Sequence, residues 1–215
     1  PKLVEPDSAA CGEIILELLE LLGVTLTRQM AEALYLAIST DTGCFKYSNT
    51  TAHTHAAAAT LIAAGELLKL GVDISAMTRR LYRTQPMNRV KLTRIAYNKL
   101  RFMFDGQVGV IDFDKHDFEE TGCTFGQADG LVNKALEVEG VRMAVLASER
   151  DDGIKMSLRA VEPDTVNDIA VLFGGGGHAQ AAGCTIHAPL QEALDQMLAA
   201  MKDKLDKTPR PEKRA

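Results

Sequence analysis

The sequence lacks any apolar run long enough to cross a membrane. A membrane helix needs about 20 consecutive apolar residues, and the longest apolar segment, residues 14–22, is interrupted by Glu17 and Glu20. The chain starts at Pro1 with neither an initiator methionine nor an apolar signal core, so we expect no secretory peptide. These absences predict a soluble, cytoplasmic protein with no membrane partner.

Paired cysteines and an excess of basic residues are missing as well. No C-x-x-C pair offers half of a zinc site, so we expect reduced thiols at the four scattered cysteines, Cys11, Cys44, Cys123 and Cys184. The 24 basic and 29 acidic residues give a net charge of −5, which argues against a protein that coats duplex nucleic acid. Any contact with nucleic acid or nucleotide must come from a local site.

The chain has an ordinary globular composition, and its first half predicts helices. The chain has 215 residues, 46% of them hydrophobic, and is long enough to form one large or two small domains. Apolar residues repeat at helical spacing up to Gly23, in a helix that Ser8 can cap, and again after Thr27. Residues 44–47 predict a short extended piece. Thr50 or Thr51 can then cap an alanine-rich helix that ends near Gly65.

After these helices the pattern changes twice. Helices that begin at Asp73, are interrupted near Pro86 and continue to Leu100 read as a linker with a solvated basic face. From Arg101 the chain predicts a smaller α/β domain that opens with a hairpin at residues 102–111. Its further expected elements are a helix at 126–139, strands at 141–148 and 154–158, a helix to Phe173 opened by a capping box at Thr165–Asp168, a strand at 184–187 and a helix at 190–205.

These patterns predict an α/β protein in three parts. We expect a mostly helical first part over 1–72, linker helices over 73–100, and a mixed-sheet α/β domain over 101–206, followed by a disordered tail at 207–215.

The most unusual segment is Gly174–Gly183, which reads Gly-Gly-Gly-Gly-His-Ala-Gln-Ala-Ala-Gly. Four consecutive glycines lose much conformational entropy on folding, which favours a site that needs a backbone without Cβ atoms. Successive N–H groups there can form a concavity for an anion, and His178 can add a hydrogen bond or a charge to a phosphate. A flexible linker is the alternative. The apolar residues on both sides of the glycines argue against it.

Strand alternation places Lys155, Ser157 and Arg159 on one face of the strand before this segment. A hydroxyl and a guanidinium on such a face suit a nucleotide phosphate. An exposed polar face of a half-buried strand would look the same, and the pattern alone leaves both readings open.

The first half offers one carboxylate of interest. Asp41 lies among hydroxyls in the stretch 39–43, Ser-Thr-Asp-Thr-Gly, which by itself favours a turn or a cap. A single carboxylate is too few ligands for a hard metal ion. His53 and His55 are interpreted as first-turn helix residues, and the acidic cluster Asp112, Asp114, His116 and Asp117 as helix capping.

Taken together, these motifs resemble a known family. The segment from Gly174 to Gly183 resembles the signature of the DHH-associated C-terminal domain. Residues 37–43, with 45, 48–51 and 61–65, resemble the last motif region of the DHH phosphoesterase domain. The order matches over nearly the whole chain, and the RecJ-like subgroup of oligoribonucleases and phosphoadenosine-phosphate phosphatases is the most similar.

The resemblance implies a two-domain, manganese-dependent phosphoesterase that uses a pair of metal ions on short single-stranded RNA or nucleotides. Asp41 would be the last metal-binding carboxylate. The substrate phosphate would lie on Gly175, Gly176, Gly177 and His178, and Arg159 with Ser157 would hold the nucleotide end of the substrate.

One departure from the family pattern is large. The sequence contains no Asp-His-His and no Asp-x-Asp triad, so its catalytic residues are unknown. We expect that the chain is part of a longer polypeptide and that it lacks a complete metal site. An apolar face left by a missing sheet would favour homodimers. The alternatives are a non-catalytic nucleotide-binding module, a cyclic-dinucleotide phosphodiesterase and a purely structural domain.

Overall fold

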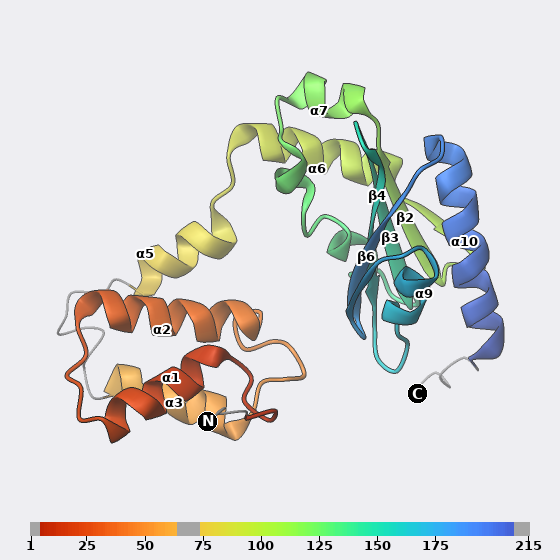
Figure 1. Cartoon of the computed structure of the whole chain (residues 1–215). Coiled ribbons are helices and arrows are strands. Elements are labelled where there is room, and N and C mark those ends of the chain that lie inside the picture. Colours follow the sequence, from red (N-terminus) through yellow and green to blue (C-terminus); the bar gives the residue numbers. More distant parts are fainter. Residues whose placement is uncertain (1–4, 64–73, 209–215) are drawn as a thin grey trace. The chain divides into compact units, whose positions relative to one another are not determined.

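The computed structural model of the protein describes residues 5–63 and 74–208. The chain divides into two compact units, Pro1–Thr84 and Gln85–Ala215 (Figure 1). This division falls inside the segment 73–100 that the sequence predicts as a linker. The exact domain limits expected from the sequence stay predictions.

The described residues of the first unit form helices and no strand, which confirms the expected helical character. Three helices pack together around Leu16, Leu34, Ile38 and Leu61, all almost fully buried. The helices of this unit are α1 (Cys11–Leu21), α2 (Arg28–Asp41), α3 (Ala52–Ala63), α5 (Ile74–Thr78) and the π-helix η1 (Arg79–Arg83).

Two of the expected helix caps are confirmed and one is wrong. Thr27 accepts a hydrogen bond from the Met30 backbone N–H, and Thr51 accepts one from that of Thr54. Ser8 does not cap α1, because the helix begins two residues later than that cap requires, after Ala10. The predicted helix end at Gly65 and helix start at Asp73 lie outside the described residues.

The extended piece predicted at residues 44–47 is also wrong. Cys44 and Phe45 take left-handed backbone conformations, with φ of 60° and 62°. The Thr42 carbonyl accepts from the backbone N–H groups of residues 46 and 47, and the Thr42 hydroxyl accepts from that of Phe45. This local network bends the chain into a compact turn after α2.

The second unit is a mixed six-stranded sheet with helices, which confirms the predicted α/β domain. The strand order is β1-β2-β3-β4-β6-β5, and only β2 and β3 run parallel. Its strands are β1 (Arg101–Met103), β2 (Val108–Phe113), β3 (Met143–Arg150), β4 (Gly153–Ala160), β5 (Gly176–His178) and β6 (Ala181–Ile186). Its helices are α6 (Met87–Lys99), α7 (Lys115–Thr121), the 3-10 helix η2 (Phe125–Ala128), α8 (Asn133–Leu136), α9 (Asn167–Leu172) and α10 (Leu190–Lys207).

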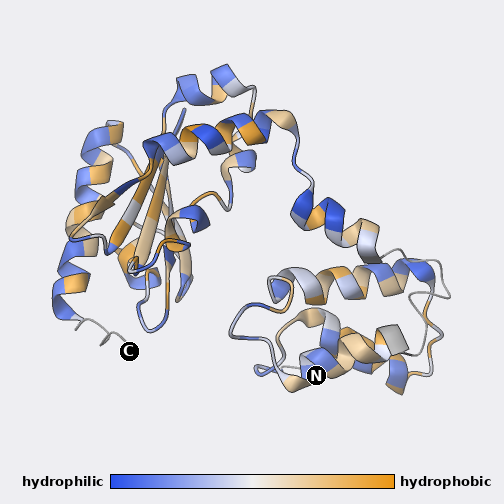
Figure 2. Ribbon diagram, turned by 180° about the vertical axis from the view of Figure 1, so that it is seen from behind, coloured by the Kyte–Doolittle hydropathy of each residue, from blue (hydrophilic) through white to orange (hydrophobic). Residues whose placement is uncertain are grey.

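The two faces of this sheet have separate apolar cores. On one face, Met156 and Leu158 of β4 pack in the same cluster as residues of α9 and α10. On the other, Ala144 and Leu146 of β3 pack with residues of α6, α7, η2 and α8. Figure 1 places α10 and α6 on opposite sides of the strands, and in Figure 2 the hydrophobic colour is concentrated along those strands.

The helix predicted at 126–139 is broken in the structure. The segment holds the end of η2, a turn and the short helix α8. Gly130 in the turn has a φ of +83°, which is left-handed. The Arg89 guanidinium of α6 binds the backbone carbonyls of Gln127 and Asp129, and so provides partners that a continuous helix would supply internally.

The capping box predicted at Thr165–Asp168 is wrong as well. The residue before α9 is Val166, without a side-chain cap. The Thr165 hydroxyl donates to the Asp168 carboxylate, and Lys204 of α10 binds both side chains. Lys204 thus binds the two side chains that were predicted to cap the helix. The cap expected from the acidic cluster is confirmed, because Asp114 and Asp117 form a reciprocal capping box at α7.

Candidate functional site

One half of a sheet face stays open. Residues of β4, β6 and β5 that point away from the α9 and α10 side are half-buried or exposed, whereas Ala144 and Leu146 of β3 on the same face are buried. We call this half the open face. It consists of Lys155, Ser157, Arg159, Gly176, His178, Ala181, Gly183 and Thr185.

The strand register brings the predicted binding residues together on the open face. Alternate residues of β4 are buried, so Lys155, Ser157 and Arg159 do share one side as predicted. Two cross-strand rows result, Ser157–Gly183–Gly176 and Arg159–Ala181–His178. Neighbouring strands lie about 4.8 Å apart, so the backbones of Arg159 and His178 are about 10 Å apart.

Of the four consecutive glycines, Gly176 and Gly177 lie in the edge strand β5, and Gly174 and Gly175 connect it to α9. Gly174, with a φ of +70°, ends α9, and β5 then pairs antiparallel with β6. A Cβ atom at Gly175 would lie 2.2 Å from the Gly183 carbonyl oxygen, and one at Gly177 would lie 2.5 Å from the Ala181 oxygen. Packing alone therefore requires glycine at these two positions.

Gly176 differs from its two neighbours. A Cβ atom there would meet nothing within 4 Å. Neither packing nor a left-handed backbone explains a glycine at this position. Close approach of a ligand to the backbone would explain it.

Cationic groups on the open face suit an anionic ligand. The Arg159 guanidinium donates to the Leu158 carbonyl oxygen at 2.8 Å. Within residues 5–63 and 74–208, neither Arg159 nor the exposed His178 forms an ion pair. A guanidinium, an imidazole and the Ser157 hydroxyl can together donate to phosphate oxygens.

Burial raises the pKa of the Cys184 thiol, whose side chain points into the core behind the open face, and the Lys155 ammonium partly opposes this effect. Cys184 therefore stays protonated at neutral pH and is not a nucleophile.

Asp41 lies at the end of α2 in the first unit, and its side chain is exposed. Its backbone carbonyl accepts from the Asn49 amide at 3.1 Å. His53 and His55 lie in the first turn of α3, as predicted. The His53 Nε2 atom lies 3.1 Å from the Glu17 carboxylate, and the His55 ring stacks on Phe45.

The described residues do not fit a complete metal centre. Among them, no three His, Cys, Asp or Glu side chains gather in a set that could hold a metal ion. Asp41 alone supplies too few ligands for manganese, which is commonly held by several carboxylate, imidazole or water ligands.

The match to a family model decides the classification. The model described as the DHHA1 domain matches residues 93–207, which include every strand of the sheet and the open face. The chain belongs to the DHHA1 domain family. The resemblance inferred from the glycine-histidine motif is thereby confirmed.

Two relatives of this DHHA1 protein match more of the chain than the family model does. It is 32% identical over 204 residues to the bifunctional oligoribonuclease and PAP phosphatase NrnA of Thermus thermophilus, covering 94% of this chain and 59% of the relative. Its identity to NrnA of Bacillus subtilis is 31% over 202 residues, covering 93% of this chain and 61% of the relative. The chain thus spans about three fifths of the length of these curated relatives.

A solved structure is similar across both units. The crystal structure of an exopolyphosphatase-related protein from Bacteroides fragilis matches with a TM-score of 0.84 and 25% identity, over 94% of this chain and 58% of that one.

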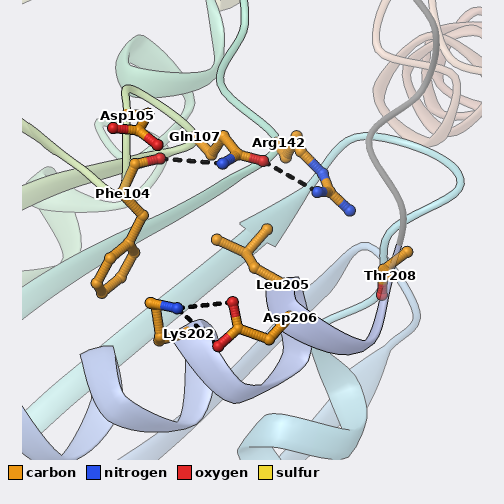
Figure 3. Close-up of a pocket in the computed structure, with 8 residues that line it drawn as sticks. All are labelled: Phe104, Asp105, Gln107, Arg142, Lys202, Leu205, Asp206 and Thr208. Carbon is orange, nitrogen blue, oxygen red and sulfur yellow. Dashed lines mark hydrogen bonds and ion pairs between the residues drawn. The ribbon is translucent and has the colours of Figure 1, made fainter.

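The DHHA1 unit has a pocket that is separate from the open face. Figure 3 shows this pocket of about 320 Å³ between the β1–β2 turn and α10. Its cations are already paired, because Arg142 forms a buried bidentate ion pair with Asp164 and Lys202 binds Asp206. The pocket thus has no unpaired cationic side chain for a phosphate.

Sequence reasoning did not select Arg150 of β3. By strand parity it lies on the same face as Lys155, and its guanidinium stacks 5.1 Å from the centre of the Phe125 ring. Its buried Nε has no hydrogen-bond partner among the residues that the structure describes. No hydrophobic alternation marks it in the sequence, because residues 143–147 are all apolar. In the described parts of the chain, no helix is both long enough and apolar enough to span a bilayer.

Proposed function

We propose that this chain carries the substrate-binding half of a manganese-dependent phosphoesterase. Its substrates are short single-stranded oligoribonucleotides or 3'-phosphonucleotides, and its products are mononucleotides. The observation that carries the proposal is the register that joins Arg159, His178 and Gly176 on the open face. The names of the two NrnA relatives support the substrate class.

In this proposal the chain's own residues bind and orient the phosphate. The Arg159 guanidinium and the His178 imidazole donate to phosphate oxygens, the Ser157 hydroxyl adds a donor, and the bare Gly176 backbone allows close approach. A metal pair would supply the attacking hydroxide. Asp41 would be one of its ligands, and since no three metal-type ligands gather among the described residues, the others would come from elsewhere.

Nucleotide binding and hydrolysis test separate parts of the proposal. By calorimetry, the 215-residue chain is expected to bind AMP, and His178→Ala or Arg159→Ala is expected to weaken binding about tenfold, the loss of one charge-assisted contact. With manganese, the same chain is expected to release no AMP from 5'-phosphorylated diadenylate, whereas the full-length protein releases it.

Failure of the full-length protein on the diadenylate and on a 3'-phosphonucleotide would reject the proposed substrates. A cyclic dinucleotide in the same assay tests the phosphodiesterase alternative.

The second candidate is a non-catalytic nucleotide-binding module. The absence of a gathered set of three metal-type ligands among residues 5–63 and 74–208 favours it. It predicts nucleotide binding that is indifferent to a chelator and no hydrolysis by the full-length protein. Homodimer formation and the cytoplasmic location stay predictions; sedimentation velocity tests the first.

A further inference from the structure

The longest stretch of the sequence without an acidic residue lies where the first unit ends and the second begins. Residues 74–104 contain eight basic residues and no aspartate or glutamate, and we call them the basic segment. The rest of the chain holds 16 basic and 29 acidic residues. A strong positive charge is therefore confined to one stretch of an acidic chain, and the proposed function does not use it.

Three of the eight cations have structural partners in the second unit. Arg89 binds two backbone carbonyls of the turn before α8. Lys99 pairs with carboxylates at the start of α7, and Arg101 pairs with one in β2. These contacts hold α6 and β1 to the rest of the unit, so the three cations are not available to a ligand.

The other five cations are exposed, and none of them forms an ion pair within residues 5–63 and 74–208. They are Arg79, Arg80 and Arg83 of η1 and Lys91 and Arg94 of α6. Like charges three or four residues apart on a helix repel each other. An anionic partner would remove this repulsion, and the local positive potential would attract a ligand with many negative charges.

The outer face of α6 places an aromatic ring beside two of these cations. Leu92 and Ala96 are buried in the core with residues of β2 and β3, whereas Tyr97 is 51% exposed. Lys91, Arg94 and Tyr97 follow one another at three-residue spacing, so each is the neighbour of the next on one side of the helix. Cations that bind phosphates next to a ring that stacks on an unpaired base are typical of single-strand binding.

The π-helix η1 is held by a contact that leaves its arginines exposed. The Tyr82 hydroxyl donates to the Ser39 carbonyl oxygen at 2.9 Å, and no residue of η1 is buried. π-helices are rare and occur frequently at functional sites. This turn thus fixes the backbone of three arginines without covering their side chains.

We propose that the basic segment binds the phosphate backbone of long single-stranded RNA, which is a partner of the protein and not its substrate. The proposal does not depend on the proposed function, because none of the five cations lies on the open face. A membrane fits less well, since a helix that lies on lipid needs a free apolar face and that of α6 is packed on the sheet. Cleavage of long RNA produces short oligoribonucleotides, so this contact would keep the protein near a source of its proposed substrates.

Fluorescence anisotropy with an oligouridylate of about 20 nucleotides tests the proposal. The RNA carries fluorescein in place of its 5'-phosphate, and EDTA is present so that no metal takes part. The 215-residue chain is expected to bind it about a hundredfold more weakly at about 200 mM than at about 50 mM KCl, because five neutralised phosphates give a slope of about −3.5 for log affinity against log salt. An excess of AMP is expected not to displace the RNA.

Two sets of variants remove the cations from one helix at a time. Lys91→Gln with Arg94→Gln is expected to reduce the steepness of the salt slope by about 1.4, and the change of all three η1 arginines to glutamine by about 2. Both sets are expected to change AMP affinity less than about twofold. All five side chains are exposed, so the variants are expected to fold.

Two further variants separate stacking from charge and control for net charge. Tyr97→Leu is expected to weaken RNA binding about tenfold with an unchanged salt slope, because stacking carries no charge. Lys202→Gln with Lys207→Gln also removes two positive charges, but from α10, where both lysines pair with carboxylates. This control is expected to alter neither the affinity for RNA nor its salt slope.

Each outcome decides a different claim. An unchanged salt slope in both sets of cation variants would overturn the proposal, while AMP binding by the same chain would leave the proposed function standing. Equal weakening of RNA and AMP would also overturn it, because the basic segment would then belong to the substrate site. A chain that binds the RNA but not AMP would reject the proposed function and support this proposal. Preferential binding to vesicles of equal parts phosphatidylcholine and phosphatidylglycerol, lost in the same variants, would assign the segment to a membrane instead.

Discussion

Gly176 and Gly177 are adjacent in the sequence, but the structure constrains them differently. Gly177 has a φ of +145°, and a Cβ atom there would lie 2.6 Å from the Ala182 Cα atom. Gly176 has open space around it. The glycine run therefore contains both a packing requirement and a position that packing leaves free.

Alanine substitutions separate these two roles. Gly177→Ala is expected to lower the free energy of unfolding by more than about 1 kcal/mol. Its φ of +145° is unfavourable for a residue with a side chain, and the new Cβ atom would clash with Ala182. Gly176→Ala is expected to leave stability unchanged or slightly higher, since glycine in a strand is entropically unfavourable. Urea unfolding of both variants measures this difference.

The same pair of variants reports on the ligand. Gly176→Ala is expected to weaken AMP binding about tenfold, because a methyl group on the open face blocks close approach of the phosphate. Unchanged AMP affinity in this stable variant would contradict the role assigned to Gly176.

At the scale of elements, α7 is held by a cap and a lysine. Asp114 and Asp117 cap the helix reciprocally, and Lys99 of α6 binds both carboxylates. Burial opposes the charged form of Asp114, but the hydrogen bond from the Asp117 backbone N–H and the Lys99 ammonium outweigh it and lower the pKa of Asp114. These contacts join α6 to the start of α7.

This cap predicts a dependence of stability on pH. Because the folded-state pKa of Asp114 is lowered, its contribution is present above the unfolded value of about 3.9 and is lost as the pH falls through the folded value. Asp114→Ala is expected to lower the free energy of unfolding by about 1 kcal/mol at pH 7. The difference from wild type should shrink in urea unfolding at pH 3.

Glu120→Ala provides the matched control on the exposed side of α7, with an expected change within about 0.5 kcal/mol. An equal loss for Asp114→Ala at pH 3 and pH 7 would contradict the assigned cap.

Local sequence patterns predicted most elements but not those set by tertiary contacts. The hairpins around residues 105 and 152 follow from turn residues between apolar strands, and the structure contains both. In place of the helix expected at 126–139 the chain turns at Gly130, and Arg89, about 40 positions away in the sequence, binds two carbonyls of this turn. The turn after α2 depends on hydrogen bonds to the Thr42 hydroxyl and the Thr42 carbonyl. Hydrophobic periodicity does not predict such bonds.

The sequence was enough to select the residues of the candidate site but not to predict how they lie relative to one another. Alternation along the strand is enough to place Lys155, Ser157 and Arg159 on one face, whereas the pairing of β4 with β6, and of β6 with β5, sets which of them lies beside His178. Register depends on long-range packing, so the sequence offered Arg159 and His178 as separate candidates.

At the scale of the whole molecule, the two units have separate cores. The first core is confined to residues 10–77 and the two others to residues 92–205. A unit with its own core and a complete sheet can fold by itself.

A fragment of residues 85–215 is therefore expected to fold and to bind AMP with the affinity of the whole chain, because the entire open face lies in it. Circular dichroism with thermal unfolding tests the folding, and calorimetry tests the binding. A fragment that folds but does not bind would place part of the nucleotide site in the first unit.

The position of β5 at the edge of the sheet has a consequence for amide hydrogen exchange. This strand has three residues and pairs only with β6, so its opening costs less free energy than opening of the central β3–β4 pair. A nucleotide that contacts Arg159 on β4 and His178 on β5 spans the strand between them. Occupancy of the site would then slow exchange at the backbone amides of β5 and β6, and this edge strand would become a reporter of the bound ligand.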